Sequence, residues 1–349
     1  MKVCLLGPAT YGGRFEFGRW PVASEQCDPG IAARSYAAQL ELFEHAEELG
    51  FDWVSVSEHH YSPGLMAPNP FVLAAAASQR TERVKIAVLG PLMPLTNPVR
   101  VAEEVAMLDS LSGGRAVVLF LRGIPNELLT YSADGEPPGD SRGLTQEATQ
   151  LALRALREHE PFSWDGEHFT FKTVSVWPRA LQDPHPPVFY SGNSLESAEF
   201  AAAHRLCLAI GFAPPDVVAT NVEHYRTHAR DAGWEPTNDN VLYRARALVA
   251  PTDERADEIV ERARAAVAKR LGLAPGAPPL GGGGGAPGVA GFQFHGTPQT
   301  ILEQVSAYRD AGVGIIDVAF APDAYGRGRD ATKEALSAFG QVLADVQAL

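Results

Sequence analysis

The sequence predicts an α/β fold of the (β/α)8 class, a TIM barrel with insertions, in a single domain over residues 1–349. Short apolar segments alternate with amphipathic helical patterns from one end of the chain to the other. The apolar segments are continuous, as expected of parallel strands that helices cover. Eight such segments occur, which is the number at which a parallel sheet closes into a barrel.

Strands and helices are expected to alternate along the chain, with two helices between the seventh and the eighth strand. The strands are predicted at 3–6, 53–57, 84–89, 116–121, 188–191, 206–210, 242–248 and 315–320. The helices are predicted at 33–49, 70–79, 98–111, 144–158, 195–204, 216–231, 253–269, 298–311 and 332–346. A doubly wound open sheet is the alternative, but residues 7–13 lack the glycine spacing of a dinucleotide-binding turn after the first strand.

Three insertions interrupt the alternation. Residues 131–140 form a polar loop, and residues 164–177 alternate like a small β excursion. Residues 273–291 hold an unbroken glycine run at 281–285, which costs too much conformational entropy to be held rigid. We expect this flexible segment to act as a lid on the catalytic face, with a tolerated linker as the alternative.

The composition is that of a globular protein with a sizeable core, at 45% hydrophobic and 20% charged residues. A net charge of -13 argues against nucleic acid as a partner, because binding to phosphate backbones needs concentrated basic residues. The three cysteines are far apart, which favours neither disulfides nor a zinc site and suits a reducing cytoplasm. No apolar stretch approaches the roughly 20 residues that span a bilayer, so no membrane segment is expected.

Glu58, His59 and His60 directly follow the predicted second strand. Barrel enzymes place their sites at the carboxyl ends of the strands. His59 is the candidate general acid or base, whereas His60 is expected to be structural. A surface loop with two histidines is the alternative, and because the other histidines are scattered no metal site is expected.

A phosphate site is predicted on the same rim. Arg122 follows the fourth strand, and Asn193 and Ser194 open a helix whose free backbone N–H groups, with the Ser197 hydroxyl, suit an anion. Arg142, just before the predicted helix at 144–158, could close a second side of the phosphate site. Taken singly, Arg122 could instead form a buried ion pair and Ser194 could be a plain helix cap.

An ordered set of short motifs resembles the bacterial luciferase-like flavin monooxygenases, with the luciferase α subunit as the nearest pattern. The motifs are Glu58-His59-His60, Asn69-Pro70-Phe71-Val72, Arg80-Thr81, Asn97-Pro98-Val99-Arg100, Glu103, Leu108-Asp109, Leu111-Ser112-Gly113-Gly114-Arg115, Arg122-Gly123, Ser141-Arg142, Asn193 to Glu199 and Gly296-Thr297-Pro298. Their order and their spacing from residue 58 to residue 123 make the set specific, although no single motif is.

The resemblance implies that the barrel binds FMN without a dinucleotide fold. His59 would then be the catalytic histidine, and Glu58, Leu89 and Gly90 would contact the cofactor, with a cis peptide between Leu89 and Gly90. The residues implied around the phosphate are Arg122, Arg142, Asn193, Ser194 and Ser197.

The activity implied by the resemblance is that of a two-component monooxygenase. A separate flavin reductase would supply reduced FMN, which reacts with O2 to a C4a-hydroperoxide that oxygenates a small apolar or aromatic substrate by hydroxylation or Baeyer–Villiger oxidation. A homodimer through the helices at 70–79 and 98–111 is also implied. Leu121 stands where the light-emitting relative has a reactive cysteine, so light emission is not expected.

Two other functions stay open. One is a deazaflavin-dependent hydride-transfer enzyme of the same superfamily, and the other is a non-catalytic flavin-binding subunit. The presence of His59 together with the arginines and serines of the phosphate site argues against the second.

Overall fold

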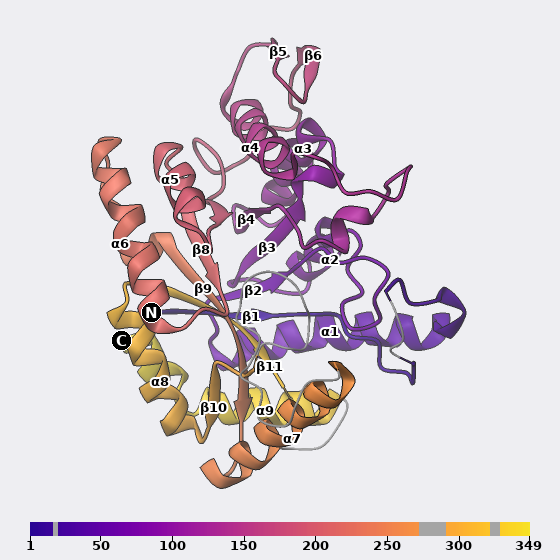
Figure 1. Ribbon diagram of the computed structural model, residues 1–349, viewed down its shortest axis with the longest axis vertical. Helices are drawn as coiled ribbons and strands as arrows, with labels where there is room; N and C mark the ends of the chain where they lie inside the picture. Colours follow the sequence, from indigo (N-terminus) through magenta and orange to yellow (C-terminus); the bar gives the residue numbers. More distant parts are fainter. Residues whose placement is uncertain (17–19, 272–290, 322–328) are drawn as a thin grey trace. The chain divides into compact units, whose positions relative to one another are not determined.

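The computed structural model describes residues 1–16, 20–271, 291–321 and 329–349 (Figure 1). Contacts between residues group the chain into two compact units, which are described separately. The first unit comprises Met1–Leu6, His45–Trp53 and Gly192–Leu349, and the second comprises Gly7–Glu44 and Val54–Ser191.

The second unit is built on four parallel strands in the order β2-β3-β4-β7. Their bounds are β2 Trp53–Val56, β3 Lys85–Leu92, β4 Ala116–Leu121 and β7 Val188–Ser191. The helices that accompany them are α1 Pro29–Leu49, whose residues from His45 on belong to the first unit, α2 Pro70–Ser78, α3 Pro98–Leu111 and α4 Ser141–Arg157. Seven of the eight residues of β3 are buried, which explains the continuous apolar sequence of this strand.

Helices α2 and α3 begin with the same Asn-Pro pair. The Asn69 side chain accepts a hydrogen bond from the backbone of Val72, and the Asn97 side chain accepts one from the backbone of Val99. Proline follows each asparagine at the first helical position, where its missing N–H group costs nothing. The repeated motif therefore fixes where both helices start.

The first unit carries β1 next to β11, β11 next to β9, and β9 next to β8, all parallel. The bounds are β1 Lys2–Leu6, β8 Cys207–Gly211, β9 Val241–Val249, β10 Phe294–Gly296 and β11 Ile315–Phe320. The helices are α5 Leu195–Ala203, α6 Pro215–Asp231, α7 Asp253–Leu271, α8 Pro298–Asp310, α9 Arg329–Gly340 and α10 Leu343–Ala348.

All eight predicted strands are confirmed, and with their flanking helices they identify a (β/α)8 barrel. The β excursion is also confirmed as an antiparallel pair of β5 Phe162–Asp165 and β6 Thr170–Val174. Strand β10, which pairs with the last three residues of β9, was not predicted because three residues are too few to show a period.

The prediction of one helix over residues 332–346 is wrong, because the segment forms α9 and α10 with a break after Gly340. A Cβ at Gly340 would lie 3.3 Å from the Leu49 side chain, and glycine is a poor helix former. The predicted glycine-rich lid at 273–291 lies almost wholly outside the described residues, and the prediction of a single domain stays a prediction. Among the described helices, none is long and apolar enough to cross a membrane.

Candidate active site

The carboxyl ends of β2 and β3 are tied together by Ser57 and Glu58. The Ser57 hydroxyl donates to the Leu89 carbonyl at 2.6 Å, and the Glu58 backbone N–H donates to the Gly90 carbonyl at 3.2 Å. One Glu58 carboxylate oxygen also accepts the Leu92 N–H at 3.0 Å. The Leu89–Gly90 peptide is cis, as the resemblance implies, and the carbonyls of both of these residues accept hydrogen bonds from residues at the end of β2.

Gly90 lies directly against the backbone of β4. A Cβ at this position would collide with the carbonyl oxygen of Leu119 and would lie 2.9 Å from its carbonyl carbon. Because the neighbour is backbone within a sheet, it cannot move away as a flexible side chain would. Only glycine fits here, so the chain path at this predicted cofactor-contact residue depends on the missing side chain.

His59 forms a hydrogen-bonded pair with Glu127, whose side chain is nearly buried. The His59 Nδ1 atom lies 3.0 Å from Glu127 Oε1, and the two side chains are 23% and 6% exposed. Since a carboxylate can only accept, the Nδ1 atom carries a proton, and in the neutral ring the Nε2 atom keeps its lone pair. This is the orientation in which an imidazole can take up a proton at Nε2.

His60 is held inside the protein, as expected. Its Nε2 atom lies 2.8 Å from Glu58 Oε1, its backbone N–H donates to Glu127 Oε2 at 3.1 Å, and its side chain is 2% exposed. The Tyr131 ring packs edge-to-face on it with centroids 5.3 Å apart. His60 thus joins the Glu58 carboxylate, which holds the Leu92 N–H, to the Glu127 carboxylate, which holds His59.

Glu127 was not predicted from the sequence. It lies in a short 3-10 turn, Glu127–Leu129, in the loop after β4, and no motif marks it. The one signal available was a carboxylate a few residues past the end of an apolar strand, which is weak because such residues are common on surfaces.

Arg122 and Arg142 both lie within electrostatic reach of Tyr190 on β7. Burial raises the pKa of Tyr190 to about 12, and the charges of Arg142 and Arg122 act against that rise. Arg122 is exposed immediately after β4, and Arg142 lies in the first turn of α4. Among the described ion pairs none involves Arg122, so the alternative of a buried ion pair is not what this part of the chain shows.

The other predicted phosphate residues lie at the start of α5 in the first unit. Ser194 caps the helix by accepting the Ser197 N–H at 3.4 Å, and the two hydroxyls are 3.1 Å apart. The Asn193 amide exchanges two hydrogen bonds with the backbone of Gly211, at 2.9 and 3.2 Å. Because these residues and the two arginines belong to different units, their convergence on one phosphate stays a prediction.

Comparison with known proteins gives several similar chains. A protein of Sinorhizobium fredii, described as uncharacterized, is 37% identical over 51% of this chain and 51% of its own length. The alkanal monooxygenase alpha chain of Photorhabdus luminescens is 29% identical over 57% of this chain and 54% of its own. The oxygenase component of the flavin-dependent trigonelline monooxygenase of Acinetobacter baylyi is 29% identical over 48% of this chain and 46% of its own length. The matched segment thus spans about half the length of these curated relatives.

Solved structures share the fold over nearly the whole chain. Monooxygenase RslO1 from Streptomyces bottropensis gives a TM-score of 0.74 at 24% identity, covering 99% of both chains. The oxygenating constituent of 3,6-diketocamphane monooxygenase from Pseudomonas putida, in complex with FMN, gives 0.72 at 20% identity, covering 100% of this chain and 98% of that one. An F420-dependent secondary alcohol dehydrogenase gives a TM-score of 0.71 at 19% identity, covering 97% of this chain and 98% of that one.

The family model for luciferase-like monooxygenases matches residues 15–314. This range contains the His59–Glu127 pair, the cis peptide at Gly90, both arginines and the start of α5. The chain belongs to the luciferase-like monooxygenase family.

Proposed function

We propose that the protein is the oxygenase component of a two-component monooxygenase that uses reduced FMN and O2 to oxygenate a small apolar or aromatic substrate. The observation that carries the proposal is the His59–Glu127 pair, in the same unit as the cis peptide at Gly90 and the exposed Arg122. Family membership and a solved relative in complex with FMN support it.

Residues of the second unit fit the polar and planar parts of FMN. Arg122 and Arg142 supply two guanidinium groups suited to a phosphate, which such groups can bind in bidentate fashion. Burial raises the pKa of Tyr190 to about 12, so its hydroxyl stays protonated well above neutral pH and can act as a hydrogen-bond donor. Gly90 lies where the resemblance implies a contact with the flat ring, and because the Leu119 backbone takes up the space of its missing side chain, the chain path at this contact is fixed.

When bound, reduced FMN would supply the activation of O2. The role proposed for the chain itself is to hold one proton, that of His59, at a defined nitrogen atom. Glu127 keeps the proton of His59 on Nδ1 and thereby leaves Nε2 free to take a proton during the reaction. Glu58 and His60 would fix the geometry of this corner, because both are almost fully buried and hydrogen-bonded to each other.

Two partners follow from the proposal. A separate flavin reductase would deliver reduced FMN, in keeping with a relative that is described as an oxygenase component. A second copy of the chain would pack on α2 and α3, where Val72, Met107 and Leu111 are 68%, 51% and 50% exposed. Large apolar side chains exposed to this degree on neighbouring helices are typical of an interface.

A deazaflavin-dependent hydride transfer is the second candidate. It is favoured by the fold shared with the F420-dependent alcohol dehydrogenase. A non-catalytic subunit is disfavoured by the His59–Glu127 pair, because a subunit that only supports a partner has no need for an oriented imidazole.

Arg122→Ala tests the cofactor site. The loss of one charged hydrogen bond to phosphate, about 1.5–3 kcal/mol, should weaken FMN binding by roughly 10- to 100-fold in calorimetric titrations. Arg179→Ala is the matched control, since Arg179 is also exposed in the second unit and donates only to the Glu158 carbonyl among its described contacts. Equal FMN affinity of parent and Arg122→Ala would place the phosphate elsewhere.

A further inference from the structure

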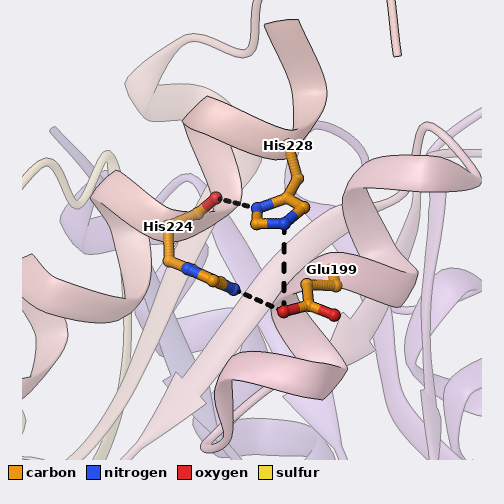
Figure 2. A group of neighbouring side chains, drawn as sticks. All are labelled: Glu199, His224 and His228. Carbon is orange, nitrogen blue, oxygen red and sulfur yellow. Dashed lines mark hydrogen bonds and ion pairs between the residues drawn. The ribbon is translucent and has the colours of Figure 1, made fainter. Parts of the chain in front are cut away.

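A cluster of three metal-ligating side chains lies on helices α5 and α6. Glu199 of α5 and His224 and His228 of α6 place one ligand atom each within 4.8 Å of the other two (Figure 2). From this geometry we propose a binding site for a late first-row divalent metal ion, of which Zn²⁺ is the representative. No metal site was expected from the sequence, and none of the roles proposed above uses these residues.

The two helices explain why the three side chains meet. His224 and His228 are four residues apart on α6, so their imidazoles lie on one face of the helix, with ring centroids 4.2 Å apart. Helix α5 packs beside α6, and its residue Glu199 reaches toward both rings (Figure 2). The three side chains are 46%, 26% and 37% exposed in chain order, so an ion in solution can reach them.

The distances suit a tetrahedral ion. Zinc bonds of about 2.0–2.2 Å to imidazole nitrogen and carboxylate oxygen place two ligand atoms of a tetrahedral site roughly 3.3–3.6 Å apart. Glu199 Oε1 lies 2.8 Å from His224 Nε2 and 3.8 Å from His228 Nε2, and these two separations bracket that range. Two imidazoles and one carboxylate are a ligand set that zinc and its neighbours accept, with a further position open to water.

The tautomer of His228 is already the one that a metal ligand needs. Its Nδ1 atom lies 2.9 Å from the carbonyl oxygen of His224, and because a carbonyl only accepts, Nδ1 carries the proton. In the neutral ring the Nε2 lone pair therefore points toward the Glu199 carboxylate, so two acceptors face each other across 3.8 Å. A cation between them removes this mismatch, and a backbone partner on the second ring nitrogen is typical of metal-bound histidines.

His224 needs one change on binding. In the metal-free protein its Nε2 atom donates to Glu199 at 2.8 Å, so this proton has to leave Nε2 when the metal arrives. The bound ion would replace one hydrogen bond by three metal–ligand bonds and would link α5 to α6. A ligand that binds the folded but not the unfolded state stabilises a protein by mass action. The thermal midpoint of unfolding should therefore rise with metal concentration.

The test is a calorimetric titration of the untagged, chelator-treated full chain with Zn²⁺. We expect one ion per chain at this site, and at least about tenfold weaker binding in His228→Ala and in Glu199→Gln. His159→Ala, which removes an exposed histidine outside the cluster, should bind like the parent. Zinc affinity that is unchanged in both cluster variants, or that falls equally in His159→Ala, would overturn the proposal.

Two further measurements guard against a variant that is merely misfolded. The metal-free thermal midpoints of parent and variants should agree, while added Zn²⁺ should raise the midpoint of the parent and of His159→Ala but not that of His228→Ala. Co²⁺ in place of Zn²⁺ should give the visible absorption of a four-coordinate ion with nitrogen and oxygen ligands, in the parent only. A six-coordinate Co²⁺ spectrum identical in parent and His228→Ala would contradict the site.

Discussion

Replacing Glu127 by glutamine probes how His59 is prepared for chemistry. The carboxylate accepts two hydrogen bonds, from His59 Nδ1 at 3.0 Å and from the His60 backbone N–H at 3.1 Å. Glutamine has the same shape but offers one accepting oxygen and one donating amide. It can therefore satisfy only one of the two donors.

Both arrangements of the glutamine have a cost. If its oxygen serves His59, the buried His60 N–H faces a donor and loses its partner, which costs about 1–3 kcal/mol of folding free energy. If its oxygen serves His60, the amide donates to His59 Nδ1, the proton moves to Nε2, and that atom can no longer accept one. Loss of a charge-assisted hydrogen bond, about 1.5–3 kcal/mol, would then slow a step that needs this base by roughly 10- to 100-fold.

The two arrangements are separable by experiment. Nitrogen-15 NMR of the histidine side chains reports the tautomer of His59 directly, and urea unfolding reports the folding free energy. Glu136→Gln, which changes an exposed carboxylate in the 131–140 loop, is the control and should alter neither. A Glu127→Gln protein with the parental tautomer, stability and rate would refute the role assigned to Glu127.

Two predictions concern stability. Gly90→Ala should lower the free energy of unfolding by about 1–3 kcal/mol or more, because the added methyl group overpacks against the Leu119 carbonyl, and it should also weaken FMN binding. Gly139→Ala is the control and should change neither property, because no atom lies within 4 Å of its added Cβ. Urea unfolding measures the stability of both variants, and FMN titration measures their affinity. Asp317→Ala should lower the free energy of unfolding by about 3–5 kcal/mol, because it removes a fully buried carboxylate that lies 2.7 Å from the mostly buried Arg244 guanidinium. A loss below about 1 kcal/mol in urea unfolding would show that water solvates the arginine instead.

The sequence predicted the elements well because barrel strands are continuous apolar segments with helices between them. It placed β4 and β7 at the residues where the structure has them. It also found Glu58, His59 and His60, since three ionisable residues directly after a buried strand are conspicuous.

What the sequence could not predict depends on contacts between distant residues. Glu127 lies 68 residues from His59, and no local pattern connects them. Likewise, His224 and His228 share a helix face, but their third partner, Glu199, comes from another helix 25 residues earlier. Such constellations become visible only when the fold brings their members together.

We propose that reduced FMN and O2 together oxygenate an organic substrate on this protein. The most direct test is to incubate the protein with reduced FMN, ¹⁸O2 and a panel of small apolar and aromatic metabolites, and to measure the products by mass spectrometry. We predict a product that gains one ¹⁸O atom with the parent protein and that is lost, or formed far more slowly, with His59→Ala. Unlabelled products that differ from their substrates by two hydrogens, formed only with the deazaflavin F420, would contradict the claim and favour hydride transfer.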